Sequence, residues 1–113
     1  MTPSLVLRAH ATLHAGGMSI EYLRVGSGDT VVVLHAGGSG SEAVQSLVDS
    51  LALDHRVIVP VLAGDDRFVV ALDNLLEGIG ACTVGLVAVG ELGPLAQEFV
   101  ASRPGRVSSL VTV

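Results

Sequence analysis

Four short runs rich in valine and leucine constrain the fold of this chain most strongly. They read TVVVLHAGG at residues 30–38, RVIVPVLAG at 56–64, VGLVAVG at 84–90 and VSSLVTV at 107–113. The first three are close to continuously apolar, whereas a strand with one face in water alternates apolar and polar residues. Nearly continuous apolar strands are typical of parallel sheets that are covered on both faces. The runs therefore predict a sheet buried between two layers.

Helix-like segments separate these runs. Residues 41–52, 66–80 and 93–105 each carry apolar residues at the spacing of one helix face. Gly80 is placed to end the second segment, and Pro94 lies in the first turn of the third. The alternation of strand and helix predicts parallel strands joined by right-handed crossovers.

Two further strands are expected near the N-terminus, at residues 5–16 and 18–29. The first alternates strictly and places His10 and His14 on its polar face. Residues four apart in a strand are separated by about 13 Å, too far to share a metal ion, so we expect both imidazoles to face solvent. Because a short glycine-containing link joins the two strands, they are expected to form an antiparallel hairpin.

These patterns predict an α/β fold in a single domain that spans residues 1–113. The expected sheet is mostly parallel, with about six strands, an N-terminal antiparallel hairpin and about three helices.

Composition and charge exclude several classes of binding partner. The net charge is −5, and the six lysine and arginine residues never form a run. We therefore expect neither nucleic acid nor an anionic membrane as a partner. The N-terminus lacks the pattern of a signal peptide and no apolar stretch is long enough to span a membrane, which predicts a cytoplasmic protein. Cys82, the single cysteine, is expected to be a small core residue, and no metal site is expected.

Three stretches of the chain resemble the N-terminal half of an alpha/beta-hydrolase domain. They read MSIEYLRVGSGDTVVVLHAGG, HRVIVPVLAG and VGLVAVGELGPLAQEFVASRPGRVSSLVTV. The resemblance covers the chain from about residue 5 onward, and it implies a truncated form of the family's three-layer sandwich. It also implies that His35, Ala36, Gly37 and Gly38 match the segment that helps to form the oxyanion hole.

The family's nucleophile elbow, Gly-x-Ser-x-Gly, matches this chain poorly. Aligning the strand on one side and the phrase RPGRV at residues 103–107 on the other, without gaps, places the elbow at residues 88–92. Gly90 then occupies the nucleophile position, and a glycine has no side chain that can attack a carbonyl. The next residue, Glu91, would supply an oxyanion-hole-like backbone N–H together with Ala36, Gly37 and Gly38.

A shift of the elbow by one residue places Glu91 at its tip. Carboxylates can act as covalent nucleophiles, so this register would leave the chain a reactive group. The competing interpretation is that Glu91 is an acid favoured by the positive end of the following helix. The sequence leaves both registers open.

The resemblance also implies that the acid and the histidine of the family's triad would follow Val113, the last residue of the sequence. Ordinary serine-hydrolase activity is therefore not expected of this chain. The apolar segment 107–113 would form an exposed sheet edge, which predicts a homodimer or a partner subunit that covers it.

Ligands of such sheets bind in the crevice at the carboxyl ends of the parallel strands. Here the pocket rim would include Ser39, Asp65 and Asp66, and Glu91 with His35 could serve as general acid and base. The competing interpretation gives all of these residues structural roles, with His35 bonded to backbone and the aspartates capping a helix.

Residues 38–43, GSGSEA, also satisfy the dinucleotide fingerprint Gly-x-Gly-x-x-Ala between a strand and a helix. The next strand lacks the acidic residue that would hold a ribose, so a simple turn and helix cap is preferred and no cofactor is expected. The sequence thus predicts a catalytically degenerate, homodimeric binding or regulatory protein with a possible small-molecule ligand. The alternative is a small-molecule hydrolase or lyase with Glu91 and His35 at a dimer interface.

Overall fold

The structure is a computed structural model that describes residues 8–15, 17–35, 42–62 and 67–112. Its strands are β1 Arg8–Ala15, β2 Met18–Val25, β3 Asp29–His35, β4 His55–Pro60, β5 Val84–Val89 and β6 Val107–Thr112. Its helices are α1 Glu42–Leu51, α2 Phe68–Gly78 and α3 Gly93–Ser102, with 3-10 turns η2 Gly90–Leu92 and η3 Pro104–Arg106.

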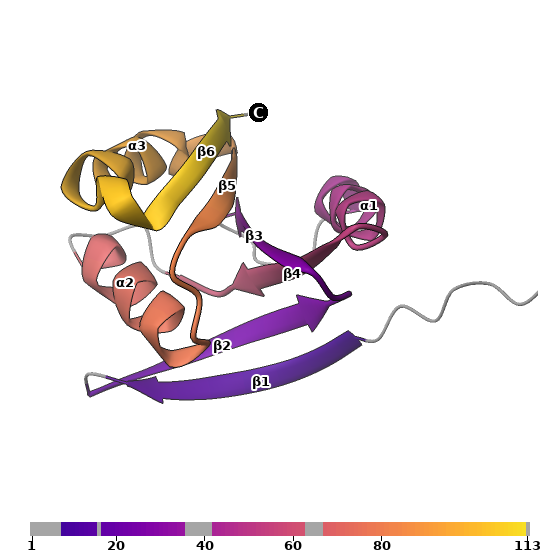
Figure 1. Ribbon diagram of the computed structural model, residues 1–113, viewed down its shortest axis with the longest axis horizontal. Coiled ribbons are helices and arrows are strands. Elements are labelled where there is room, and N and C mark those ends of the chain that lie inside the picture. The colour runs from indigo at the N-terminus through magenta and orange to yellow at the C-terminus, as the bar shows by residue number, and fades with distance from the viewer. Residues whose placement is uncertain (1–7, 16, 36–41, 63–66, 113) are drawn as a thin grey trace, which may run out of the picture.

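The strands form one sheet in the order β1-β2-β4-β3-β5-β6 (Figure 1). β1 and β2 pair as an antiparallel hairpin, and β2 also runs antiparallel to β4. The pairs β3–β4, β3–β5 and β5–β6 are parallel. The predicted fold class, a mostly parallel sheet with an N-terminal hairpin, is therefore confirmed.

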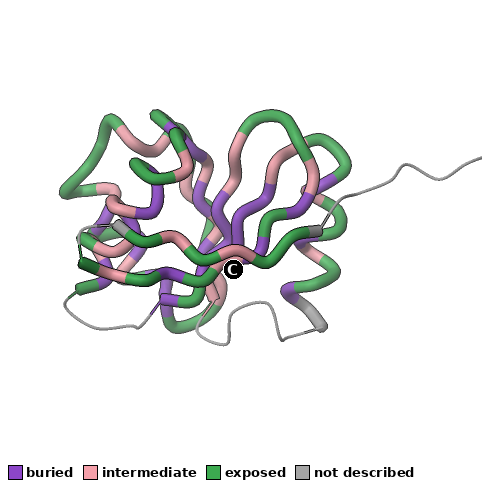
Figure 2. Tube along the Cα trace, turned by 90° about the horizontal axis from the view of Figure 1, so that it is seen from below, coloured by how far each residue is buried: buried purple, intermediate pink, exposed green. Residues whose placement is uncertain are grey.

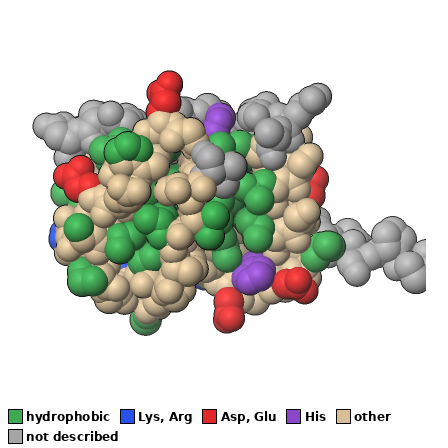
Figure 3. Space-filling model, turned by 90° about the horizontal axis from the view of Figure 1, so that it is seen from above, with side chains coloured by type: hydrophobic (Ala, Val, Ile, Leu, Met, Phe, Trp, Pro, Cys, Tyr) green, Lys and Arg blue, Asp and Glu red, His purple; other side chains and the backbone are tan. Residues whose placement is uncertain are grey.

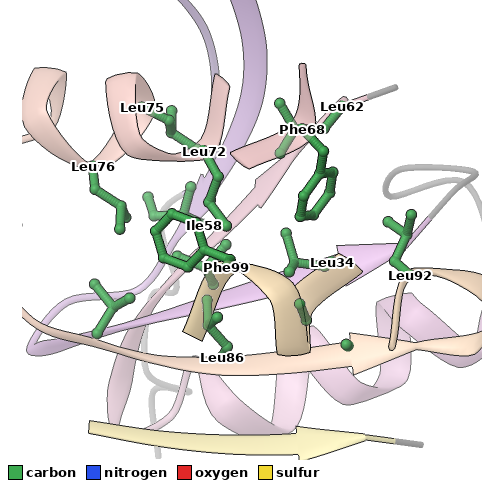
Figure 4. Packing of buried hydrophobic residues seen from close by; sticks show 14 of the residues in the cluster. Leu34, Ile58, Leu62, Phe68, Leu72, Leu75, Leu76, Leu86, Leu92 and Phe99 are labelled. Atoms are coloured by element: carbon green, nitrogen blue, oxygen red, sulfur yellow. The ribbon is translucent and has the colours of Figure 1, made fainter. Parts of the chain in front are cut away.

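Helices cover the two faces of the sheet unequally. α2 and α3 lie together on one face and α1 lies on the other (Figure 1). The larger core cluster joins Phe68 and Leu72 of α2 and Phe99 of α3 to the sheet residues Leu34 and Leu86 (Figure 4). All five side chains are at most 1% exposed, and burial of each contributes about 1.5 to 3 kcal/mol. The α2–α3 side therefore supplies most of the stabilising core.

A second cluster packs α1 against β2, β3 and β4. This cluster contains Val44 and Val48 of α1 and, from the sheet, Val33, Val57 and Val59. The inner strands β3 and β4 are accordingly buried on both faces, as their continuous apolar sequences predict. Figure 2 shows buried positions gathered along the interior of the trace and exposed ones along its periphery.

β5 departs from the prediction that it is covered on both faces. Val84, Leu86 and Ala88 are buried, but the alternate residues of the strand are only half-buried. The buried set belongs to the α2–α3 cluster, whereas Val87 and Val89 lie at the margin of the α1 cluster. The apolar sequence of β5 thus reflects one covered face and one partly open face.

Cys82 is also placed differently from the prediction. It is exposed, in the connection between α2 and β5, and is not a core residue. The preceding residue, Ala81, is buried in the core, so this connection turns one side chain inward and leaves Cys82 at the surface. Burial of a single cysteine follows from its position in the fold, and residue type alone predicted it wrongly.

Ion pairs join α2 to the segment after α3. Arg106 Nε lies 3.3 Å from Asp73 Oδ1, Arg106 Nη2 pairs with Glu77, and Arg103 Nε lies 3.6 Å from Asp73 Oδ2. The hydrogen bond to Glu77 raises the pKa of the Arg106 guanidinium. In the described part of the chain, no helix is long and apolar enough to cross a membrane.

Candidate functional site

A sharp turn joins β5 to α3 and forms the centre of the candidate site. Val89 ends the strand in an extended conformation, with φ −109° and ψ 124°. Gly90 follows with φ +68°, in the left-handed region that side chains disfavour. The chain then makes the 3-10 turn Gly90–Leu92 and continues directly into α3.

The residues around this turn explain where it forms. Leu92 is 3% exposed and packs into the core beside Ala96, so it anchors the start of the helix against the sheet. Pro94 lies at the beginning of α3, where its missing N–H costs no helical hydrogen bond. The backbone that follows Gly90 is therefore held against the sheet.

His35 lies beside the turn. It is the last residue of β3, and the parallel register pairs it with Val89 of β5. Its side chain is half-buried, whereas Glu91 is exposed. The carboxyl ends of β3 and β5 therefore bring His35, Gly90 and Glu91 to the same end of the sheet, where ligands of open parallel sheets bind.

Comparison with solved structures finds close matches to this arrangement. A variant of the epoxide hydrolase of Vigna radiata superposes with a TM-score of 0.80 and 22% identity over 93% of this chain and 38% of its own. A serine hydrolase from Cycloclasticus zankles gives a TM-score of 0.79 and 17% identity over 93% of this chain and 44% of its own. This chain has the fold of the alpha/beta hydrolases.

Sequence comparison adds a local likeness. Over 63 residues the chain is 35% identical to a 2-hydroxy-6-oxo-6-(2'-aminophenyl)hexa-2,4-dienoic acid hydrolase of Metapseudomonas resinovorans, a match of 56% of this chain and 19% of that protein. No family model matches the chain. The chain thus spans about two fifths of the length of the similar structures, and the resemblance to part of an alpha/beta-hydrolase domain is confirmed.

Several predicted site residues lie outside the described residues. They are Ala36, Gly37, Gly38 and Ser39 after β3, and Asp65 and Asp66 before α2. Most of the candidate dinucleotide fingerprint, through residue 41, lies there as well. Of the predicted site residues, the described ranges hold only His35, Gly90 and Glu91.

The two histidines of β1 are exposed, as their alternation predicts. His14 Nδ1 lies 2.9 Å from Ser19 Oγ on the neighbouring strand, a local hydrogen bond across the hairpin. Within the described ranges, no group of three or more His, Cys, Asp or Glu side chains is gathered closely enough to hold a metal ion.

One feature of the surface was not found from the sequence. Arg24 and Arg56, far apart in the chain, line the same hollow at the opposite end of the sheet from Gly90. Neither residue belongs to a motif, and only the strand order β2-β4-β3 brings them onto one face. The sequence around a basic residue in a strand does not indicate which residues of other strands will lie beside it.

Proposed function

We propose that this chain is a catalytically degenerate alpha/beta-hydrolase-like protein that acts as a homodimer in binding or regulation. The observation that carries the proposal is Gly90, which has no side chain at the turn where the family resemblance places a nucleophile. Its φ of +68° supports that register, because the nucleophile elbow is a sharp, strained turn from strand to helix.

The absence of a side chain at Gly90 is not explained by crowding. A β-carbon built on Gly90 meets no atom of the described residues within 4 Å. Among the described residues, then, no clash requires a glycine here, and its positive φ is the structural reason for one. Without a hydroxyl, thiol or carboxylate at this position, no covalent intermediate can form on it.

Glu91 has a structural role that requires no chemistry. It is an exposed acid in the first turn of the helical segment that follows β5. A negative side chain is stabilised there by the unpaired N–H groups and by the helix dipole. The proposed ligand crevice lies beside this turn, at the carboxyl ends of β3 and β5.

The outer edge of β6 supports the homodimer. β6 is the last strand of the sheet, and the side chain of Val111 is 53% exposed. Val111 pairs in register with Val87, which is half-buried on the partly open face of β5. Hydrophobic side chains also gather across the middle of the face seen in Figure 3, with acidic residues around its rim. An edge strand beside exposed apolar residues is a favourable place for a second copy to pack.

A second candidate function is that of a small-molecule hydrolase or lyase that uses Glu91 and His35. The pairing of His35 with Val89 favours it, because that pairing places an imidazole next to the turn that carries Glu91. A carboxylate and an imidazole at one crevice can act as general base and acid.

Turnover measurements separate the two functions. The wild-type protein, Glu91→Gln and His35→Ala are assayed against a panel of aryl esters and epoxides, with circular dichroism to confirm folding. We expect the three proteins to give the same background rate. Turnover by the wild-type protein that falls in either folded variant would overturn the degenerate function and support the second candidate.

A further inference from the structure

A hollow of 350 Å³ lies at the amino ends of the parallel strands, away from the candidate site. Its lining consists of Ala9, Arg24, Gly26, Ser27, Gly28 and Arg56. β3 runs from Asp29, beside this hollow, to His35, beside the elbow, a length of about 20 Å. The hollow is therefore a separate place on the molecule.

The register of the sheet directs two arginines into this hollow. Arg24 of β2 pairs with Ile58 of β4, and Arg56 precedes Ile58 by two residues on the same face. Such diagonal neighbours are about 7 to 8 Å apart, within reach of long side chains. Ala9 of β1 pairs with Arg24 on the outer side, and its small side chain leaves the space above the strands open.

The Arg56 guanidinium is already oriented. Its Nε and Nη2 both donate to Thr30 Oγ1, at 3.0 and 2.6 Å. A guanidinium carries five N–H donors in a rigid plane, so three remain for a ligand. Among the described residues, neither Arg24 nor Arg56 forms an ion pair with an acidic side chain.

The turn at residues 26–28 completes the hollow. Gly26 and Gly28 have φ of +81° and +113°, while Ser27 between them does not have a positive φ. Gly26, Ser27 and Gly28 all line the hollow, so the backbone of this turn forms part of its wall. The turn cannot carry larger residues at Gly26, because a β-carbon there would lie 2.5 Å from the carbonyl oxygen of His55.

We propose that this hollow binds a phosphate group, either inorganic phosphate or a small phosphate monoester. Two of the six basic residues of a chain with net charge −5 meet here without a counter-ion from the described residues. An anion between them relieves their mutual repulsion, and the guanidinium plane matches a tetrahedral oxyanion through paired N–H bonds. The Ser27 hydroxyl is a further donor at the same place.

The test is a titration of the full chain with inorganic phosphate and with methyl phosphate, followed by amide resonances and by thermal unfolding. Ionic strength is held constant with sodium chloride, because surface charges are screened by salt. We expect saturable shifts at the amides of residues 26–28 and a rise in the melting temperature. Tighter binding of methyl phosphate would identify a monoester as the preferred form, and tighter binding of inorganic phosphate the free ion.

Matched variants decide whether the two arginines carry the binding. Arg24→Gln is expected to weaken phosphate binding about tenfold or more, and Arg56→Lys to weaken it although the charge is retained. Arg103→Gln removes the same charge at an exposed site elsewhere and is expected to leave the affinity within about twofold. Absence of saturation in the wild-type protein, or equal loss in Arg24→Gln and Arg103→Gln, would overturn the proposal.

Discussion

At the scale of single residues, the backbone conformation of Gly90 determines which residues this turn can hold. Its φ of +68° is a conformation that glycine adopts at little cost and that an L-residue adopts with strain. No described residue comes within 4 Å of a β-carbon built on Gly90. A substitution at Gly90 is therefore expected to destabilise the fold through backbone strain and not through a steric clash.

Gly90→Ala is expected to lower the free energy of unfolding by about 1 kcal/mol, because the methyl group is strained at positive φ. Gly105→Ala is the matched control, since a β-carbon on Gly105 likewise meets no described residue within 4 Å, while its φ is not positive. We expect this control to change stability by less than about 0.5 kcal/mol. Urea unfolding of the three proteins measures the difference, and equal effects of the two substitutions would contradict this explanation.

At the scale of secondary-structure elements, the contact between α2 and the segment after α3 combines a buried and a charged part. Phe99 of α3 packs into the core with Leu72 and Leu76 of α2. Arg106 then holds the outer side of α2 through Asp73 and Glu77, and its Nη1 donates to the carbonyl oxygen of Ala81 at 3.4 Å. The charged part fixes the start of β6 relative to α2.

Arg106→Gln is expected to lower the free energy of unfolding by a small, measurable amount, because contacts to Asp73, Glu77 and Ala81 are lost around a partly exposed ion-pair network. Salt screens part of this contribution, so the difference from the wild-type protein should shrink in 1 M sodium chloride. Chemical denaturation at low and high salt measures it. A difference that grows with salt would show that the ion pairs are not the source of the stabilisation.

The positions of the strands and helices were predictable from sequence, whereas the burial of each strand face was not. Continuous apolar runs predicted β3 and β4, because helices cover both faces of these strands. The same pattern in β5 overstated its burial, since α1 lies over β3 and β4 and leaves Val87 and Val89 at the margin. An apolar residue is able to be buried, but whether it is buried depends on where the helices lie over the sheet.

The candidate site shows the same limit. Strand ends and a gapless alignment predicted that His35, Gly90 and Glu91 lie at one end of the sheet. The presence of Arg24 and Arg56 in one hollow was not predictable, because it depends on the antiparallel register of β2 and β4, in which Arg24 pairs with Ile58, two residues from Arg56. Long-range register, more than local pattern, creates such a juxtaposition.

At the scale of the whole molecule, the two edges of the sheet differ in character. β1 has an alternating sequence with polar histidines on one face, whereas β6 carries the exposed Val111 beside the half-buried Val87 of β5. Natural edge strands usually carry charges or are covered by another element. The β6 edge is therefore the one that we expect a second copy to use.

Sedimentation velocity at micromolar concentration is expected to show a dimer of this chain. Val111→Lys should shift the population toward monomer, because a charge at the edge opposes desolvation. Leu53→Lys is the control, since Leu53 is 70% exposed in the connection between α1 and β4, away from β6. A monomeric wild-type protein, or equal effects of both substitutions, would contradict the homodimer.

The central claim, that the elbow holds no covalent nucleophile, is tested most directly by mass spectrometry of the intact protein and of its proteolytic peptides. The Cys82→Ser protein is used because the exposed thiol would itself react, and it is incubated with an activated aryl ester and separately with an epoxide. We predict that the elbow peptide keeps its unmodified mass in both incubations. An added mass that maps to Glu91 and disappears in Glu91→Gln would contradict the claim.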